Sequence, residues 1–134
     1  MSNFGTFDAS YMAAGEETGV RKLVDEFYLQ METLVEGQHI RAMHKGDLET
    51  IKDKLSLFLM GWLGGPRLYA DKYGSISIPQ AHQHLVINEA ERDAWLLCMT
   101  EALKHQDYSD DFKEYLIQQL AIPAERIRHT AKSF

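Results

Sequence analysis

The chain has 134 residues, enough for one domain with a single hydrophobic core, and its net charge is −6. Hydrophobic residues make up 45% of it and charged residues 25%, the balance of an ordinary water-soluble globular protein. Lysines and arginines are scattered, which argues against a nucleic-acid partner. No apolar run is long enough to span a bilayer, and the N-terminus lacks the pattern of a secretion signal. The single cysteine, Cys98, excludes an internal disulfide, so we expect a cytoplasmic protein. Because no apolar run could span a bilayer, we expect no membrane contact.

The first strong helix signal runs from Thr18 to Glu36, where apolar residues recur every three or four positions along one face. Residues 1–10 precede it, and we expect them to form a flexible or additional N-terminal segment. The stretch GQHIRAMHKGD follows, and its glycines Gly37 and Gly46 predict a turn and a short irregular corner.

A second strong helix signal follows Asp47, which we expect to cap its first turn. The apolar face of this helix ends at GGP, where the glycines favour a C-cap and Pro66 blocks continuation. Residues 67–87 are predicted to be largely irregular, with one short helix around PRLYADKY and another around His82.

Two further helices are predicted in the C-terminal half of the chain. Asn88 and Glu91 form a capping-box pattern before EAERDAWLLCMTEALKH. Ser109 opens the helix SDDFKEYLIQQLAI, and Pro123 is expected to kink it or to separate it from AERIRHTAKSF. Because no segment shows the alternation of a strand, the sequence predicts an all-α fold with four good helices.

The stretch IPQAHQHLVI contains His82 and His84, and four interpretations of it are open. The histidines are incidental residues of a solvated loop, ligands of a transition metal, acid/base catalysts, or the source of one axial ligand to haem. The remaining histidines are too dispersed to specify a multidentate metal site, and no Ser/His/Asp arrangement or carboxylate pair is apparent.

A haem needs one histidine nitrogen, an apolar slot, and a cation or hydroxyl near each propionate. The polar edge of such a slot has candidates in Lys54 and Tyr69. An apolar stripe at helical spacing is equally typical of plain core, so spacing alone does not decide between core and slot. The candidate lining residues are Phe27, Leu55, Phe58, Trp62, Trp95 and Met99.

From Tyr11 to His129 the chain resembles the group II (O-type) truncated haemoglobins. The segments that carry the resemblance are GEETGVRKLVDEFY, IRAMHKGDL, KLSLFLMGWLGGPRLYADKYG and ERDAWLLCM. The joint occurrence of FLMGWLGGPRLY and RDAWLLCM, about 23 residues apart, is its specific part. The resemblance implies a single truncated globin domain, residues 1–134, in which a two-over-two helical sandwich surrounds one haem b.

The resemblance also implies the iron ligand. In the family, the proximal histidine lies 13 residues before the tryptophan that matches Trp95, and His82 occupies this position here. His84 is then not an iron ligand. Around this histidine the chain departs from the family pattern, because Ala81 replaces an arginine and Pro79 is introduced. The alternative prediction is therefore a globin-fold protein with weakened or lost haem binding, which acts through protein contacts or as a sensor.

The distal side of the implied pocket is polar. Hydroxyl, imidazole and indole donors there would stabilise the partial negative charge of bound O2. The distal donors and their aromatic neighbour match Phe27, Tyr28, His44 and Trp95, the apolar distal wall matches Ile51 and Leu55, and the propionate contacts match Lys54 and Tyr69.

The function that the resemblance implies is binding of O2, and of CO, NO or sulfide, at iron held by His82. Such binding serves oxygen transport, storage or sensing, or redox chemistry on NO or peroxide with an external electron donor. The chain has no independent catalytic motif, so the sequence leaves peroxidase-like or NO-detoxifying turnover open. We expect a monomer or a homodimer.

Overall fold

The computed structural model describes residues 4–43, 47–74 and 88–130 of the chain. These residues form helices and no strand, which confirms the predicted all-α class. The helices are α1 (Ala9–Ala13), α2 (Glu16–Thr33), α3 (Val35–Met43), α4 (Leu48–Trp62), α5 (Leu68–Tyr73), α7 (Glu89–Lys104) and α8 (Asp110–Thr130).

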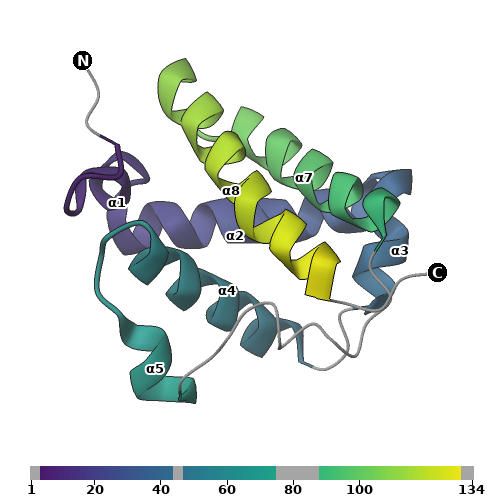
Figure 1. The fold of residues 1–134 in the computed structure, drawn as a ribbon, viewed down its shortest axis with the longest axis horizontal. Coiled ribbons are helices and arrows are strands. Elements are labelled where there is room, and N and C mark those ends of the chain that lie inside the picture. Colours follow the sequence, from purple (N-terminus) through teal and green to yellow (C-terminus); the bar gives the residue numbers. More distant parts are fainter. Residues whose placement is uncertain (1–3, 44–46, 75–87, 131–134) are drawn as a thin grey trace.

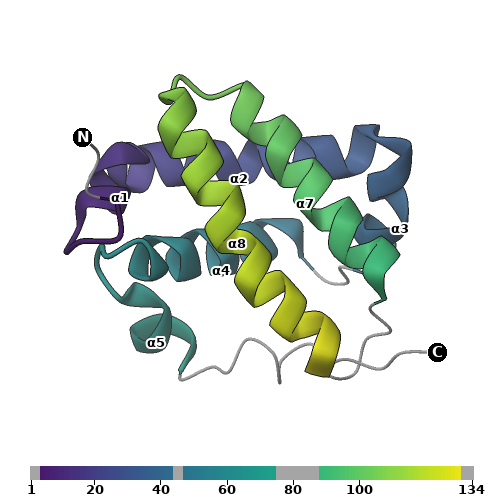
Figure 2. The ribbon, with the colours of Figure 1, turned by 45° about the horizontal axis from the view of Figure 1, so that its top comes forward.

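Two pairs of helices make up the body of the fold (Figure 1). Helix α2 packs on α4, α7 packs on α8, and the contact between α2 and α7 joins the two pairs. Figure 2 shows α7 and α8 running across the pair formed by α2 and α4. Helix α3 lies against both α2 and α7 at one end, and α5 packs on α4. The arrangement is the predicted two-over-two helical sandwich.

The predicted starts of α4 and α7 have the expected side-chain caps. Asp47 Oδ2 accepts hydrogen bonds from the Thr50 backbone N–H at 3.1 Å and from the Thr50 hydroxyl at 2.9 Å. At the start of α7, Glu91 Oε1 accepts from the Asn88 backbone N–H at 2.7 Å. Both caps satisfy backbone or side-chain donors at helix ends, where no intrahelical partner is available.

The predicted irregular corner after α2 is wrong, because the chain forms the helix α3 there. One residue in extended conformation, Leu34, separates α2 from α3. Gly37 lies inside α3, where an added Cβ would be 2.7 Å from the Met31 carbonyl oxygen and 2.9 Å from Cys98 Sγ. This glycine therefore allows a close approach of α3 to α2 and α7, and it does not mark a turn.

Of the two alternatives predicted at Pro123, a separation of the last helix into two is wrong, because α8 continues through this residue to Thr130. Ser109 caps the helix as expected, since its Oγ accepts from the Phe112 backbone N–H at 3.2 Å. Proline removes one hydrogen-bond donor from a helix interior, and α8 accommodates this loss without ending.

Several N-terminal residues, beginning with Phe4, contact the body of the fold. The ring of Phe4 meets that of Phe112 on α8 with 5.1 Å between centroids. Ser10 is buried, and its Oγ accepts from the Gly5 backbone N–H at 2.8 Å. Tyr11 then donates its backbone N–H to the carbonyl of Leu63, at the end of α4, at 3.1 Å.

The core lies mainly between α2 and the pair α7–α8. Its largest fully buried side chains come from these helices and from α4, and they are mostly leucine, methionine and phenylalanine. No helix of the described ranges is long and apolar enough to cross a membrane.

Candidate functional site

Helix α4 has two apolar faces that differ in burial. The face that contains Leu57 and Met60 is buried. The neighbouring face is equally apolar but only half-buried, and it consists of Ile51, Leu55, Phe58 and Trp62. These four residues follow one another at steps of four, three and four, so they form one stripe along the helix. We call them the α4 stripe.

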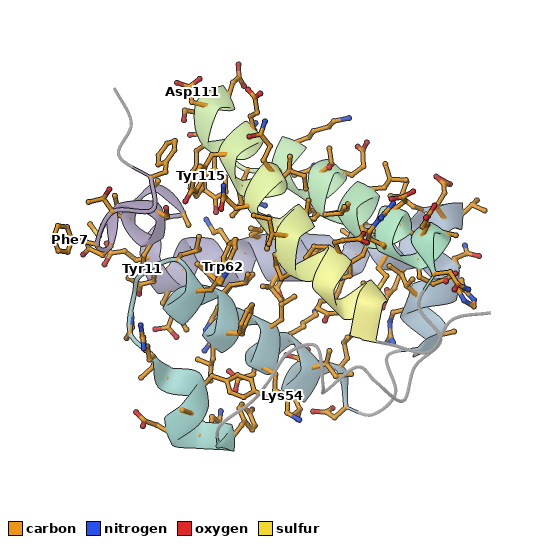
Figure 3. All side chains as sticks on the ribbon, viewed as in Figure 1. Phe7, Tyr11, Lys54, Trp62, Asp111 and Tyr115 are labelled. Atoms are coloured by element: carbon orange, nitrogen blue, oxygen red, sulfur yellow. The ribbon has the colours of Figure 1, made fainter. Side chains whose placement is uncertain are left out.

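The packing of α4 explains why the stripe is not fully covered. Among the described residues, α4 has extensive contacts with α2 and α5, but not with α7 or α8. In the view of Figure 3, Trp62 projects from α4 on the side of α8. The other described helices therefore leave the stripe partly uncovered.

Three aromatic residues meet where α2 packs on α7. The Trp95 indole lies edge-on to the Phe27 ring, with 5.0 Å between centroids, and the Tyr28 ring lies 5.1 Å from that of Phe27. Tyr28 is 4% exposed, and Met99 farther along α7 is completely buried. Burial raises the pKa of the Tyr28 phenol, and the nearby charge of Arg41 opposes this only in part. Tyr28 therefore keeps its proton and remains a hydrogen-bond donor at neutral pH.

A polar network joins α4 to α5 and α2 at one edge of the site. Asp53 Oδ2 accepts from Lys72 Nζ and from the Tyr73 hydroxyl, both at 2.7 Å, and Asp53 Oδ1 accepts from Arg21 Nη1 at 3.0 Å. Glu17 contacts the same Arg21 at 2.9 Å. Hydrogen bonds from Lys72 and Tyr73 lower the pKa of Asp53 to about 2. The carboxylate of Asp53 is therefore charged and fully engaged at neutral pH.

The next residue, Lys54, contacts an aromatic ring instead of a carboxylate. Its Nζ lies 5.2 Å from the centroid of the Tyr73 ring, and that ring lies 5.3 Å from the ring of Tyr69. The neighbouring lysines of α4 and α5 each have a carboxylate within 4.0 Å, whereas Lys54 has none among the described residues. Figure 3 shows Lys54 at the lower edge of α4, away from the helices of the other pair.

The structure thus brings together ten of the predicted site residues in three groups. Phe27, Tyr28 and Trp95 form one cluster, and Met99 is buried four residues after Trp95 on α7. The α4 stripe forms a second group, and Lys54 and Tyr69 flank Tyr73 in the third. The predicted iron ligand His82, the corner residue His44, and His84 lie outside the described residues. Within the described ranges, no group of three or more His, Cys, Asp or Glu is placed to hold a metal ion.

The sequence patterns predict no role for Asp53, Tyr73 or Arg21. Tyr73 had a usable signal, because it stands four residues after Tyr69 and side chains at this spacing share one face of a helix. Asp53 had none, since its partners are 19, 20 and 32 residues away in the sequence.

The described side chains fit a haem. Its flat ring is mostly apolar and carries two carboxylates at one edge, so a site needs an apolar wall with a cation beside it. The α4 stripe supplies an apolar wall that other described helices leave half-covered. Lys54 supplies the cation, because it neighbours Ile51 and Phe58 on the surface of α4 and has no carboxylate partner within the described ranges.

Comparison with known proteins identifies the class to which this fold and site belong. The chain matches the family model of the bacterial-like globins over residues 9–131, and it belongs to this family. It is 32% identical over 122 residues to the Group 2 truncated hemoglobin YjbI of Bacillus subtilis (strain 168), which covers 91% of this chain and 89% of that protein.

Solved structures give the same result. The Group II 2-on-2 hemoglobin of Agrobacterium tumefaciens is 33% identical, with a TM-score of 0.83 over 93% of this chain and 95% of that one. The cold-adapted truncated hemoglobin of Pseudoalteromonas haloplanktis TAC125 is 30% identical, with a TM-score of 0.83 over 88% and 95% of the two chains. The expected truncated globin fold of group II is confirmed. Membership in this family implies a haem-binding globin that takes small gaseous ligands such as O2.

Proposed function

We propose that this chain holds haem b through His82 and binds O2, CO, NO or sulfide in a polar distal pocket. When bound, the haem supplies the iron to which such a ligand attaches. The residues of the chain hold the haem, orient it and polarise the distal space. The proposal that it is a cytoplasmic protein is supported by the single cysteine, which fits a reducing compartment.

The observation that carries the proposal is the half-buried α4 stripe. Apolar surface left accessible to water costs about 25 cal/mol per Å² relative to burial, so an apolar stripe of this length favours a covering group. Ile51 and Leu55 would form the distal wall, with Phe58 and Trp62 farther along the same face. Lys54 and Tyr69 would meet the propionates, where a cation and a hydroxyl offset the carboxylate charge.

The distal donors explain which kind of ligand the pocket favours. Tyr28 keeps its phenol proton because it is buried, and Trp95 places an indole N–H on the adjacent helix. His44 is proposed as the third donor. Several donors around one site strengthen the retention of a ligand with partial negative charge, and so slow the release of O2. This favours sensing, or redox chemistry on NO or peroxide, over oxygen transport.

Turnover in such redox chemistry requires an electron donor outside this chain, because the sequence contains no flavin or nicotinamide motif. The chain therefore acts as an enzyme only with a reducing partner. We propose a monomer or a homodimer as the functional form.

The test is an absorption spectrum of the purified protein, before and after addition of hemin and then dithionite. A stoichiometric Soret band with a stable CO form is expected. His82→Ala should abolish haem retention, whereas the matched variant His84→Ala should retain it. Equal effects of the two substitutions would overturn the assignment of His82 as the iron ligand.

A second candidate function is that of a globin-fold protein that works through protein contacts without haem. It is favoured by the departures around the proposed ligand, where Ala81 replaces the arginine typical of relatives and Pro79 is introduced. A protein that folds as a helical monomer or dimer but gives no Soret band with excess hemin would overturn the haem-binding proposal and leave this second candidate.

A further inference from the structure

Asp53 and Lys54 are neighbours in the sequence with opposite charges, yet they do not pair with each other. The Asp53 carboxylate is occupied by three donors that come from two other helices. Lys54 instead holds its ammonium over the Tyr73 ring, 5.2 Å from the centroid. A charged group in such a position is attracted by the negative face of the ring.

Tyr73 contacts both Asp53 and Lys54, the first through its hydroxyl and the second through its ring. Its hydroxyl donates to Asp53 Oδ2 at 2.7 Å, and its ring faces Lys54. Because the hydroxyl is fixed, the ring has little freedom to turn away from the lysine. Lys72 on α5 and Arg21 on α2 also donate to the Asp53 carboxylate, at 2.7 and 3.0 Å respectively. The network therefore fixes α5 against α4.

The network acts on the site through Lys54, because Lys54 lies beside the α4 stripe. Lys54 lies three residues after Ile51 and four before Phe58, so its side chain borders the α4 stripe. A long lysine side chain loses much rotamer freedom when a ligand orders it, and a side chain that is already held loses less.

We propose that Asp53 is a positioning residue for the haem edge. It fixes Tyr73, whose ring holds the Lys54 ammonium beside the α4 stripe. No carboxylate of the described residues pairs with this ammonium, so it is ready to meet a haem propionate. This inference rests on the proposed function, in which a haem lies against the stripe.

The test is the rate of haem loss from the holoprotein to an excess of a haem-free acceptor globin. Asp53→Asn is expected to raise this rate about two- to fivefold, the range typical of interactions between charges near the surface. The control Asp25→Asn also removes a surface carboxylate that contacts a lysine of α4, at 3.4 Å from Lys52, but it lies outside the network and should leave the rate unchanged.

A double-substitution cycle separates positioning from general stability. In the background of Lys54→Met, Asp53→Asn should add nothing to the rate of haem loss, because its effect passes through Lys54. With haem dimethyl ester, which has no propionate carboxylates, the single variant and the parent should lose the ligand at the same rate. An effect of Asp53→Asn that persists in either experiment would overturn the inference.

The contact between Asp53 and Tyr73 can also be tested without haem, through the ionisation of Tyr73. In the apoprotein, the hydrogen bond to Asp53 raises the pKa of Tyr73, so Asp53→Asn should lower that pKa in an ultraviolet titration. An unchanged Tyr73 titration would overturn the link between the two residues. A parent protein that binds no haem would overturn the proposed function and the inference together. If the parent binds haem but the effects of Asp53→Asn and Lys54→Met on the rate of haem loss are additive, the inference alone is overturned.

Discussion

The Trp95 indole meets the Phe27 ring edge to face, with 5.0 Å between centroids and 61° between planes. This contact joins α7 to α2 beside Tyr28, whose ring lies 5.1 Å from that of Phe27. Phe27 is completely buried, so its contribution is packing. Tyr28 and Trp95 carry the polar hydrogen atoms of the cluster. If the proposed function is correct, stability and ligand binding depend on adjacent residues, and single substitutions can separate them.

Phe27→Ala should lower the free energy of unfolding by about 3–5 kcal/mol, because it leaves a cavity in the α2–α7 contact. Urea unfolding followed by circular dichroism measures this change. Phe7→Ala is the matched control, since Phe7 is 92% exposed and projects away from the body of the molecule (Figure 3). This control should change the free energy of unfolding by less than about 0.5 kcal/mol. Equal losses in the two variants would contradict the burial of Phe27.

Tyr28→Phe should speed the dissociation of O2 about tenfold, because it removes a donor worth about 1.4 kcal/mol from the distal pocket. Stopped-flow displacement of O2 by CO measures the rate. Since burial raises the pKa of Tyr28, the phenol keeps its proton as the pH rises. The dissociation rate of the parent protein should therefore stay constant from about pH 7 to pH 10, beyond which an unperturbed tyrosine ionises. A rate that rises with a midpoint below pH 10 would show that Tyr28 ionises there.

Much of the fold could be predicted because its signals are local. The caps at Asp47 and Asn88 depend on side chains three residues away, and apolar periodicity marks the faces of α2 and α4. The errors arose where tertiary packing overrides a local signal. Gly37 has the composition of a turn but lies inside α3, where α2 and α7 approach too closely for a side chain. Pro123 is predicted to kink the last helix or to divide it, and α8 is not divided there.

The site divides in the same way. The α4 stripe was visible in the sequence because its residues recur at helical spacing, although spacing did not reveal that the stripe stays half-buried. That fact depends on which helices pack on α4. The network around Asp53 was invisible, because Arg21 and Tyr73 reach it from other helices. The contact of Lys54 with Tyr73 likewise depends on the placement of α5.

Asp53→Asn should destabilise the protein in a pH-dependent manner. The pKa of Asp53 is lowered to about 2, first by the hydrogen bond from Lys72, from an ordinary value of 3.8. A lowered carboxyl pKa contributes stability above the ordinary value, and this contribution is lost as the pH falls through the folded-state pKa. The variant should therefore be less stable than the parent by roughly 1 kcal/mol at pH 6, a figure reduced for solvent screening. The difference should shrink between about pH 4 and pH 2.

Urea unfolding at pH 6, 4 and 2.5 checks this dependence in the apoprotein. The control is Asp25→Asn, because Asp25 is 67% exposed and its contact with Lys52 is 3.4 Å long. It removes the same charge but should change the free energy of unfolding by less than about 0.5 kcal/mol. A constant difference between Asp53→Asn and the parent across the three pH values would show that the charge of Asp53 does not stabilise the fold.

Gly19→Ala tests how closely the end of α1 approaches α2. A Cβ at Gly19 would lie 1.8 Å from the Ala14 carbonyl oxygen, which also accepts a hydrogen bond from the Tyr108 hydroxyl at 2.8 Å. Alanine favours a helix over glycine by about 1 kcal/mol, but the clash must move the backbone of this junction and disturb its hydrogen bond to Tyr108. Since overpacking typically costs about 1–3 kcal/mol and this contact is shorter than any real one, we expect a net loss of about 2 kcal/mol.

The matched variant Gly61→Ala should change stability in the opposite direction. Its Cβ would meet Arg67 at 3.5 Å, an ordinary van der Waals distance, so the gain of up to about 1 kcal/mol in helix propensity is unopposed. Both glycines are helical, and both substitutions add one methyl group. Only the surroundings of the added carbon differ, so the sign of the change in urea midpoint reports the packing directly. If Gly19→Ala were as stabilising as Gly61→Ala, α1 could not contact α2 in the way described.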